Sequence, residues 1–456
     1  MTFTLPDHLR QSAPALRALQ DRLLAQMVEV CYRAHPFYRC LMQRTGLEPR
    51  HLQSCDDLIR LPITTKSDFL ADPEAFRLRG DDLPAADTTV WKVIYTTGTT
   101  SGRPAPIYVT ATDFYNYLYV CQRQKEMTGL RSSDVIANVF PLTPFPMGAY
   151  GRAFDEAAAV GASIVCAHTG RGASVFPVHR SLDEAVRMAE LHRATVLWGV
   201  ASFVRRMLIR GAELGADLRS VRAVMITGEA SSRAMRDDLR RRMREMGCAG
   251  EQVVNRYGST EQGASMVECQ EGSGFHSLAP DTAFHEVVDP ASGQRIAEGD
   301  SGALVFTHLM RRGTAFLRYQ VGDIASMSTA PCPHCGRTTP RITSQPVRSG
   351  DIVKIKGTLV NLQVLKDLLE RLPQVDEYQI VVQPIDKADP LSMDELVIRL
   401  AAKAGSAPMS AEVIGERVAG LIHLHPRIEV AHRDEIFDPL MGAKPQRLVD
   451  LRPMRD

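Results

Sequence analysis

The chain has 456 residues, which exceeds one ordinary hydrophobic core and predicts two or more domains. Fifty-four basic residues against fifty-three acidic ones give a formal charge of +1, so we expect no nucleic-acid and no membrane partner. No apolar run approaches the ~18 residues that span a bilayer, and residues 1–7 lack the pattern of a signal peptide. The nine cysteines lack framework spacing, so we expect a reducing, cytoplasmic location without structural disulfides.

The order of periodic segments predicts the fold class. Residues 12–43 have helical periodicity, and from residue 90 onward short apolar runs alternate with amphipathic stretches. The strand-like runs include residues 135–137, 163–165, 195–198 and 223–226, and the amphipathic stretches include residues 181–192 and 232–246. This alternation predicts an α/β sheet with crossover helices, whose ligands bind beyond the carboxyl ends of the strands.

A loop of small and hydroxyl residues lies between two strand-like runs, at residues 90–95 and 107–109. Its residues are Thr96, Thr97, Gly98, Thr99, Thr100, Ser101 and Gly102. Such a loop can turn several N–H groups and hydroxyls toward one anion, which predicts a phosphate site. It is not a Walker loop, because no Lys-Ser or Lys-Thr closes it. A polar hairpin turn is the alternative interpretation.

A change in composition near residues 345–350 predicts a domain boundary. The residues before it are rich in Gly, Cys and Pro, and the residues after it form a mixed pattern of strands and helices. About 110 residues suffice for a small α+β domain. We therefore divide the chain into residues 1–345 and residues 346–456.

Three cysteines and one histidine have the spacing of a structural zinc set. Cys332 and Cys335 have the spacing of a zinc knuckle, and Cys269 and His276 lie upstream. His334 could replace His276 as the fourth ligand. The alternatives are four unrelated reduced residues or a redox Cys-x-x-Cys pair.

Further motifs follow one another in a fixed order along the chain. They occupy residues 61–66, 228–230, 255–261, 317–323, 348–351, 356–357 and 442–450. Together with the loop at residues 96–102, this set resembles the adenylate-forming superfamily of acyl-CoA synthetases, adenylation domains and luciferases. Within the superfamily the chain is most similar to the phenylacetate-CoA ligase branch, and the resemblance spans nearly the whole chain.

The resemblance implies a large N-terminal ATP- and substrate-binding domain of mixed sheets and helices, followed by a small mobile α+β lid. The implied function is an ATP-dependent aryl-acid:CoA ligase that forms acyl-AMP, releases pyrophosphate and passes the acyl group to CoA. Two alternatives stay open. One is the same ATP chemistry with another acceptor, as in an ATP-dependent diazotase that activates nitrite for an aromatic amine. The other is a nucleotide-binding protein without turnover.

The resemblance also assigns residues to ATP and Mg²⁺. The loop at residues 96–102 fits the β- and γ-phosphates. Gly228, Glu229 and Ala230 offer a close backbone approach for adenine, and Tyr257 could stack on its ring. Gly258, Ser259 and Thr260 precede Glu261, which takes the place of a Mg²⁺ carboxylate. Asp323 matches the carboxylate that receives the ribose hydroxyls.

The resemblance implies three catalytic residues, which are Glu261 and two cations. Arg348 adds charge near the ribose and phosphates at the domain hinge. Lys444 matches the lysine that the lid swings between the carboxylate and the α-phosphate. The sequence departs from the family at Gly350, in the hinge, and at Leu362 and Lys366, on the surface that in relatives meets the pantetheine arm of CoA.

Two stretches are expected to line an aromatic slot. The first contributes Phe140, Phe145, Ala149 and Tyr150, and the second, residues 198–202, contributes Gly199 and Ala201. Aromatic walls with glycine floors suit a planar guest, although ordinary core packing is an equal alternative for each residue. We expect ATP, Mg²⁺ and a structural Zn²⁺ as cofactors, and CoA as co-substrate. The expected partner is a small aromatic molecule, and a homodimer is possible.

Overall fold

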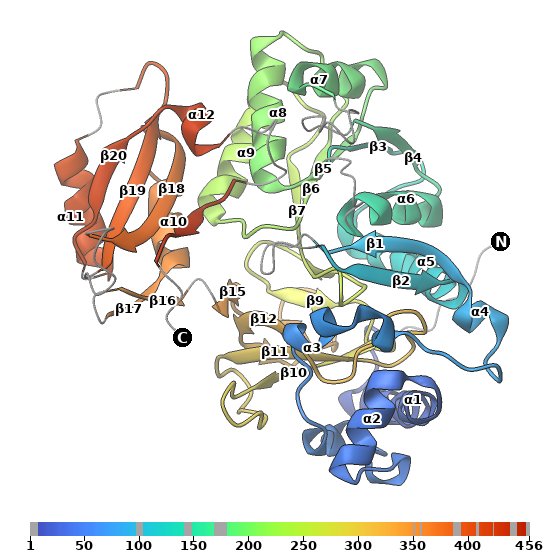
Figure 1. The fold of residues 1–456 in the computed structure, drawn as a ribbon. Helices are drawn as coiled ribbons and strands as arrows, with labels where there is room; N and C mark the ends of the chain where they lie inside the picture. The colour runs from blue at the N-terminus through green and yellow to red at the C-terminus, as the bar shows by residue number, and fades with distance from the viewer. Residues whose placement is uncertain are drawn as a thin grey trace.

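The computed structural model describes residues 8–96, 104–140, 148–167, 180–349, 352–355, 358–385, 394–406, 410–422, 424–437 and 445–452. Figure 1 shows a large N-terminal part beside a smaller C-terminal part, which is drawn in orange and red. Among the described residues, no helix combines the length and the apolar character that crossing a bilayer requires.

The N-terminal helical region, expected as one stretch over residues 12–43, forms two helices. α1 (Ala13–Ala34) ends before His35, whose backbone is extended. Pro36 explains the break, because proline disfavours helical backbone in the residue before it. α2 (Pro36–Thr45) begins at that proline. The short elements that follow are 3₁₀ helices at Pro49–His51, Cys55–Arg60 and Pro73–Phe76, and the helices α3 (Lys66–Ala71) and α4 (Ala85–Thr88).

The predicted pair of strands around the small-residue loop is a hairpin. β1 (Val90–Tyr95) pairs antiparallel with β2 (Pro106–Thr110). Two hydrogen bonds of 3.0 Å close the base of the loop, from the Ala105 N–H to the Thr96 hydroxyl and from the Thr96 N–H to the Ala105 carbonyl. Residues 97–103, which include the predicted phosphate-binding residues Thr97 to Gly102, lie outside the described residues.

A nine-stranded mixed sheet forms the centre of the large part, in the order β13-β14-β9-β8-β7-β6-β5-β3-β4. Its strands are β3 (Val135–Asn138), β4 (Ser163–Cys166), β5 (Val196–Gly199), β6 (Ala223–Ile226), β7 (Gln252–Tyr257), β8 (Met266–Glu268), β9 (Phe275–Ser277), β13 (Met327–Ser328) and β14 (Arg341–Ile342). The half from β4 to β7 is parallel, and β7 pairs antiparallel with β8. The predicted runs at residues 135–137, 163–165, 195–198 and 223–226 are therefore neighbouring strands.

Five helices accompany this sheet and share its core with it. They are α5 (Ala111–Thr128), α6 (Gly148–Val160), α7 (Leu182–Leu191), α8 (Ala201–Glu213) and α9 (Arg233–Glu245). Helices α5 and α6 pack together, and α8 packs against both α7 and α9. The amphipathic stretches at residues 181–192 and 232–246 coincide with α7 and α9, so the predicted α/β class is confirmed.

A second, antiparallel sheet lies toward the C-terminal part and shares a core with the N-terminal helices. Its strand order is β10-β11-β12-β15. The strands are β10 (Ala283–Val288), β11 (Gly302–His308), β12 (Tyr319–Ala325) and β15 (Val347–Arg348).

The C-terminal part has a hydrophobic core of its own, which extends from Val353 to Ile422. A four-stranded sheet in the order β20-β19-β18-β21 carries helices α10 and α11. Its elements are β16 (Ile352–Ile355), β17 (Thr358–Asn361), α10 (Leu362–Glu370), β18 (Val375–Pro384), β19 (Asp394–Ala402), α11 (Ala411–Ile422), β20 (Arg427–Val430), α12 (Arg433–Ile436) and β21 (Leu448–Asp450). The division between residues 345 and 346 stays a prediction.

Buried Arg318 joins the N-terminal segment to β12. Its Nε donates to Glu286 Oε1 at 3.0 Å, and its Nη1 donates to the Leu61 carbonyl at 2.9 Å. Next to it, Thr64 and Tyr319 form a parallel bridge. Because Lys66 lies two residues beyond this bridge, Arg318 fixes where that lysine stands relative to β12.

We predict that Arg318→Met lowers the free energy of unfolding of the large part by about 3 kcal/mol. Removal of one partner leaves Glu286 buried with Arg295 as its remaining cation. Urea denaturation followed by the fluorescence of Trp91 and Trp198 measures the change. Arg219→Met is the matched control, because the Arg219 side chain is 74% exposed beside Asp217 and should change stability by less than about 0.5 kcal/mol. Equal midpoints for the two variants would contradict the role of Arg318.

Candidate active site

Two adjoining cavities lie at the carboxyl ends of the parallel strands. The larger cavity, of about 400 Å³, is walled by residues of both parts of the chain. The smaller cavity, of about 130 Å³, is walled by the large part and by Arg348. Gly228, Arg256, Gly258 and Arg348 belong to the walls of both cavities. The site therefore offers two compartments that meet at one junction.

The turn after β6 forms one wall of the larger cavity. Gly228 has a φ of 87°, a backbone conformation that favours glycine. Glu229 faces the start of α8, where its carboxylate accepts hydrogen bonds from the Ser202 N–H at 2.5 Å and the Ser202 hydroxyl at 3.1 Å. These bonds hold the Gly228–Glu229–Ala230 backbone along the cavity.

A tyrosine, a carboxylate and an arginine meet in the wall of the larger cavity. The Tyr257 hydroxyl donates to Asp323 Oδ2 at 2.6 Å, and Arg348 Nε lies 3.1 Å from Asp323 Oδ1. Asp323 and Arg348 are direct partners in the antiparallel β12–β15 pair, so strand register sets this contact. Burial raises the pKa of Tyr257 well above its usual range, which keeps the hydroxyl protonated as a donor. A carboxylate oriented in this way can accept hydrogen bonds from vicinal hydroxyls.

Glu261 is the buried carboxylate of the smaller cavity. Lys66 Nζ lies 3.7 Å from Glu261 Oε1, and the Tyr319 hydroxyl lies 3.5 Å from the same oxygen. Arg152, on α6, donates to the carbonyls of Ser259 at 3.3 Å and Thr260 at 2.8 Å. Two cations and a phenol thus surround the loop that carries Glu261.

Arg256, on β7, is buried on the opposite side of its strand from Tyr257. Its Nη1 donates to Glu156 Oε2 at 2.8 Å and its Nη2 to Gln124 Oε1 at 3.0 Å. The guanidinium lies 4.7 Å from the centre of the Trp198 ring. Burial favours the neutral guanidinium, but the Glu156 carboxylate, together with Tyr117 and Cys121, outweighs this effect and raises the pKa of Arg256.

The structure brings many of the predicted residues to these cavities. Thr96, Phe140, Ala149, Gly228, Gly258, Ser259, Thr260, Glu261 and Arg348 line the smaller cavity. Gly228, Glu229, Ala230, Tyr257, Gly258, Asp323 and Arg348 line the larger one. Lys444 and Phe145 lie outside the described residues. The roles of all these residues stay predictions.

Three predicted pocket residues are absent from the walls that the described residues form. The Tyr150 hydroxyl lies 3.1 Å from Cys166 Sγ. A side chain at Gly199 would come within 2.5 Å of Val139, so this glycine serves close packing in the core. Ala201 is buried at the start of α8.

Several residues at the cavities were missed as site residues. They are Lys66, Tyr117, Arg152 and Arg256, whereas Trp198 and Val200, which also line the smaller cavity, belong to the expected stretch 198–202. Lys66 and Arg256 lie inside two of the family motifs. Their positive charge is the sequence signal that could have indicated a role at the site. Arg152 and Tyr117 reach the site from α6 and α5, and no local pattern indicates such a long-range approach.

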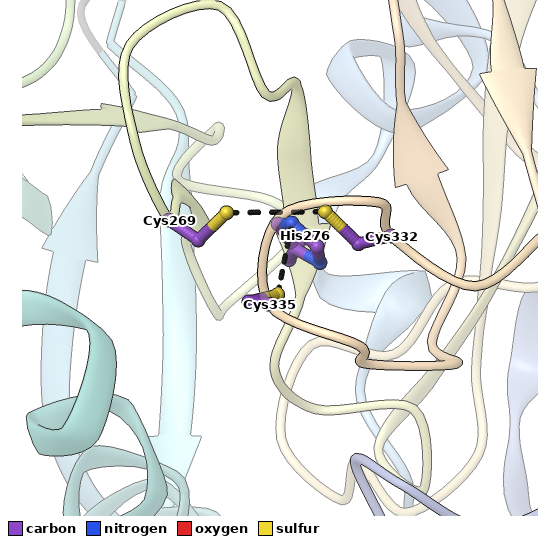
Figure 2. A group of neighbouring side chains, drawn as sticks. All are labelled: Cys269, His276, Cys332 and Cys335. Atoms are coloured by element: carbon purple, nitrogen blue, oxygen red, sulfur yellow. Dashed lines mark hydrogen bonds between the residues drawn. The ribbon is translucent and has the colours of Figure 1, made fainter.

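The predicted zinc ligands meet at one point, as Figure 2 shows. The four ligand atoms of Cys269, His276, Cys332 and Cys335 all lie within 4.8 Å of one another. Cys269 Sγ is 3.9 Å from Cys332 Sγ, and Cys335 Sγ is 3.8 Å from His276 Nε2. A tetrahedron with Zn–S bonds of about 2.3 Å has edges of about 3.8 Å, so this donor set fits zinc.

The histidine of this cluster is His276. His334, the alternative ligand, is exposed, and its Nδ1 lies 2.7 Å from Gln270 Nε2. Burial, followed by the neighbouring arginines, lowers the pKa of His276 to about 4, so its ring is neutral as a metal ligand must be. All nine cysteines lie within the described residues and are free thiols.

Comparison with known proteins identifies the family. The model of the family described as AMP-binding enzyme matches residues 47–310, which is more than half of the chain. The chain therefore belongs to the AMP-binding enzyme family.

Individual relatives agree with this family. Phenylacetate-coenzyme A ligase of Thermus thermophilus is 28% identical, over 96% of this chain and 97% of that protein. The protein of the same name from Escherichia coli is 26% identical, over 84% of this chain and 82% of that protein. A solved structure of 2-hydroxyisobutyryl-CoA ligase in its postadenylation state has a TM-score of 0.81 at 21% identity, over 98% of this chain and 92% of that one.

The predicted superfamily and its phenylacetate-CoA ligase-like branch are confirmed, and with them the prediction of an AMP-forming ligase. The predicted fold, with a large N-terminal and a smaller C-terminal domain, is confirmed as well.

Proposed function

We propose that this chain is an ATP-dependent aryl-acid:CoA ligase that acts through an acyl-AMP. The pair of adjoining cavities is the observation that carries the proposal. The larger cavity, of about 400 Å³, is within the size range of cofactor pockets. The smaller, of about 130 Å³, is close to the ~150 Å³ of an apolar cavity that binds one benzene. A nucleotide and a single-ring acid can therefore meet at the junction.

Adenylation requires a carboxylate oxygen of the acid to attack the α-phosphorus while the bond to pyrophosphate breaks. The protein must therefore supply positive potential near the phosphates and hold the carboxylate in position for its attack. Lys66, Arg152 and Arg348 supply cations around the smaller cavity. In the second half-reaction the CoA thiolate attacks the acyl carbonyl and AMP leaves.

Glu261 is proposed as the protein ligand of Mg²⁺. One or two carboxylates with phosphate oxygens and waters suffice for this ion, and Glu261 is a buried carboxylate facing a cavity. When bound, Mg²⁺ would offset charge on the phosphates. Lys66 would hold the Glu261 carboxylate and add a second cation on that side.

The larger cavity is proposed to hold the adenosine. Gly228–Ala230 would border the adenine and Tyr257 would stack on it. Asp323, oriented by Tyr257 and Arg348, would accept the ribose hydroxyls. Gln363, Lys366 and Arg447 bring the C-terminal part to this cavity, which supports its role as a lid. Lys444 is proposed to enter the site on closure.

The relatives reported above favour the ligase over the two alternatives, because their names are those of CoA ligases. Acid-dependent exchange of labelled pyrophosphate into ATP tests the proposal. A panel of aryl acids without CoA should support exchange, and CoA should then give a thioester and AMP. Exchange that needs nitrite and an aromatic amine, or no exchange with any acid, would contradict the proposal.

We predict that Glu261→Gln lowers acid-dependent exchange by about a hundred- to a thousandfold, because one preorganised charge is lost at the reacting phosphates. The unfolding midpoint should change little. Glu213→Gln is the matched control, since Glu213 is an exposed residue paired with Arg210. Exchange by Glu261→Gln at the rate of the control would remove Glu261 from the mechanism.

We further propose that Cys269, His276, Cys332 and Cys335 bind one structural Zn²⁺. The ligand geometry and the neutral histidine support it. Three cysteines and a histidine leave no open position for a substrate, so this zinc would join the β8–β9 segment to the loop before β14 and take no part in catalysis.

We predict about one zinc per chain in purified protein, measured by plasma mass spectrometry. Cys332→Ser should lose the metal and lower the thermal midpoint, because structural zinc contributes directly to folding free energy. Cys40→Ser, at an exposed free thiol, should keep both. Protein that contains no zinc and melts unchanged in chelator would refute the site.

A further inference from the structure

Gln262, the residue that follows Glu261, is fixed through its backbone and through its side chain. Its N–H donates to the Ser259 hydroxyl at 3.1 Å. Its carbonyl lies 3.2 Å from His308 Nε2, and its side-chain amide lies 2.8 Å from His285 Nε2. Both histidines are buried, at 2% and 4% exposure. The loop that carries Glu261 is therefore attached to two buried imidazole rings.

The two histidines lie on one face of the antiparallel sheet β10-β11-β12-β15. In the β10–β11 pair His308 is opposite Ala283, and His285 is opposite Phe306. Because side chains alternate between the faces of a strand, these four positions share one face of the sheet. Strand register therefore places both rings against the same residue, Gln262.

The tautomer of His308 follows from its two backbone partners. The Phe316 N–H donates to Nδ1 at 3.1 Å, so this nitrogen carries no proton. Burial, followed by the charge of Arg311, lowers the pKa of His308 to about 3, so the ring is neutral. A neutral imidazole whose Nδ1 accepts carries its proton on Nε2. His308 therefore donates to the Gln262 carbonyl.

Glu261 lies between two anchored carbonyl groups. Before it, Arg152 donates to the Thr260 carbonyl at 2.8 Å, and after it, His308 donates to the Gln262 carbonyl at 3.2 Å. The backbone on both sides of Glu261 is thereby fixed, which fixes the direction of its carboxylate into the smaller cavity. A displacement of about 1 Å at a reacting centre can lower a rate by about a hundredfold.

We propose that His308, with His285, positions Glu261 for adenylation by fixing Gln262. Both histidines are absent from the walls of the two cavities that the described residues form, so they act through the loop and contact no reacting group. This inference rests on the proposed function, in which Glu261 acts at the phosphates, and it extends the site to a face of the second sheet.

Two substitutions separate the two hydrogen bonds of His308. In His308→Gln the amide N–H can replace Nε2–H and donate to Gln262, while the Phe316 N–H loses its acceptor. In His308→Asn the amide oxygen can replace Nδ1 and accept from Phe316, while the Gln262 carbonyl loses its donor. Each variant loses one backbone partner, so the two thermal midpoints should fall alike. A merely structural role therefore predicts equal effects on activity.

We expect His308→Asn to lower kcat for acid-dependent pyrophosphate exchange by about tenfold or more, while the KM for the acid changes by less than about threefold. His308→Gln should keep kcat within about threefold of the wild-type value, because it restores the donor to Gln262. A loss in His308→Gln as large as that in His308→Asn, or no loss in either variant, would overturn the inference and leave the ligase proposal intact.

His35 provides the matched control. Its buried ring accepts from the Tyr38 N–H at Nδ1, at 3.2 Å, and its Nε2 lies 3.2 Å from the Ala315 carbonyl. That carbonyl belongs to the peptide group whose N–H reaches His308. His35→Asn removes the same kind of bond without touching Gln262, so it should lower the thermal midpoint and keep kcat within about threefold. A loss of kcat equal to that of His308→Asn would overturn the role of His308.

Amide hydrogen–deuterium exchange followed by mass spectrometry tests the positioning without turnover. In unliganded protein, peptides that cover residues 259–263 should exchange about tenfold faster in His308→Asn than in the wild type, in His308→Gln or in His35→Asn. Deuterium uptake that is equal in all four proteins would overturn the inference. If no acid supports pyrophosphate exchange by the wild type, the proposed function fails, and deuterium uptake alone decides whether His308 fixes the loop.

A second variant serves if His308→Asn does not fold. Gln262→Met removes the amide beside His285 and keeps a side chain of similar length. It should show the same two effects, a kcat about tenfold lower and faster deuterium uptake at residues 259–263. Wild-type values of both in Gln262→Met would overturn the inference.

Discussion

The buried Arg256 guanidinium is the interaction on which the arrangement of the site depends. It joins Glu156 of α6, Gln124 of α5 and Trp198 of β5 to β7, and it borders both cavities. An ion pair at this depth is costly to desolvate and strongly destabilising to break, so the four elements can hardly move independently. β7 is also the strand at which the sheet changes from parallel to antiparallel pairing. The loop that carries Glu261 therefore begins at the end of a strand that is held firmly by its neighbours.

The C-terminal part is held over the larger cavity by polar contacts. The Ser232 hydroxyl donates to Glu370 Oε2 at 2.5 Å across the two parts. Arg205 Nη1 of the large part also lies 4.0 Å from Asp376 Oδ1. Burial lowers the pKa of Arg447 to about 10, against the influence of Glu229 and Glu370. These few polar bonds can break and re-form, which suits the lid role proposed for this part.

The sequence predicted the elements and motifs whose signals are local. The strands around residues 135–137 and 223–226, the helices α7 and α9, and the cluster of three cysteines and one histidine appear where spacing and periodicity placed them. Helix α1 ended earlier than periodicity indicated, because Pro36 acts on His35. Arg152 and Arg256 were not predicted as site residues, since their roles arise from partners up to 132 residues away. Tyr150, Gly199 and Ala201, which were also expected at the site, are absent from the cavity walls that the described residues form.

The central claim is that an oxygen of the acid bonds to the α-phosphorus of ATP. An aryl acid labelled with ¹⁸O in both carboxylate oxygens tests it most directly, in a complete reaction with ATP and CoA analysed by mass spectrometry. Attack on the α-phosphorus leaves one labelled oxygen in AMP and one in the thioester. We therefore expect AMP with a single acid-derived ¹⁸O. Unlabelled AMP, or ADP with the label in orthophosphate, would contradict the account.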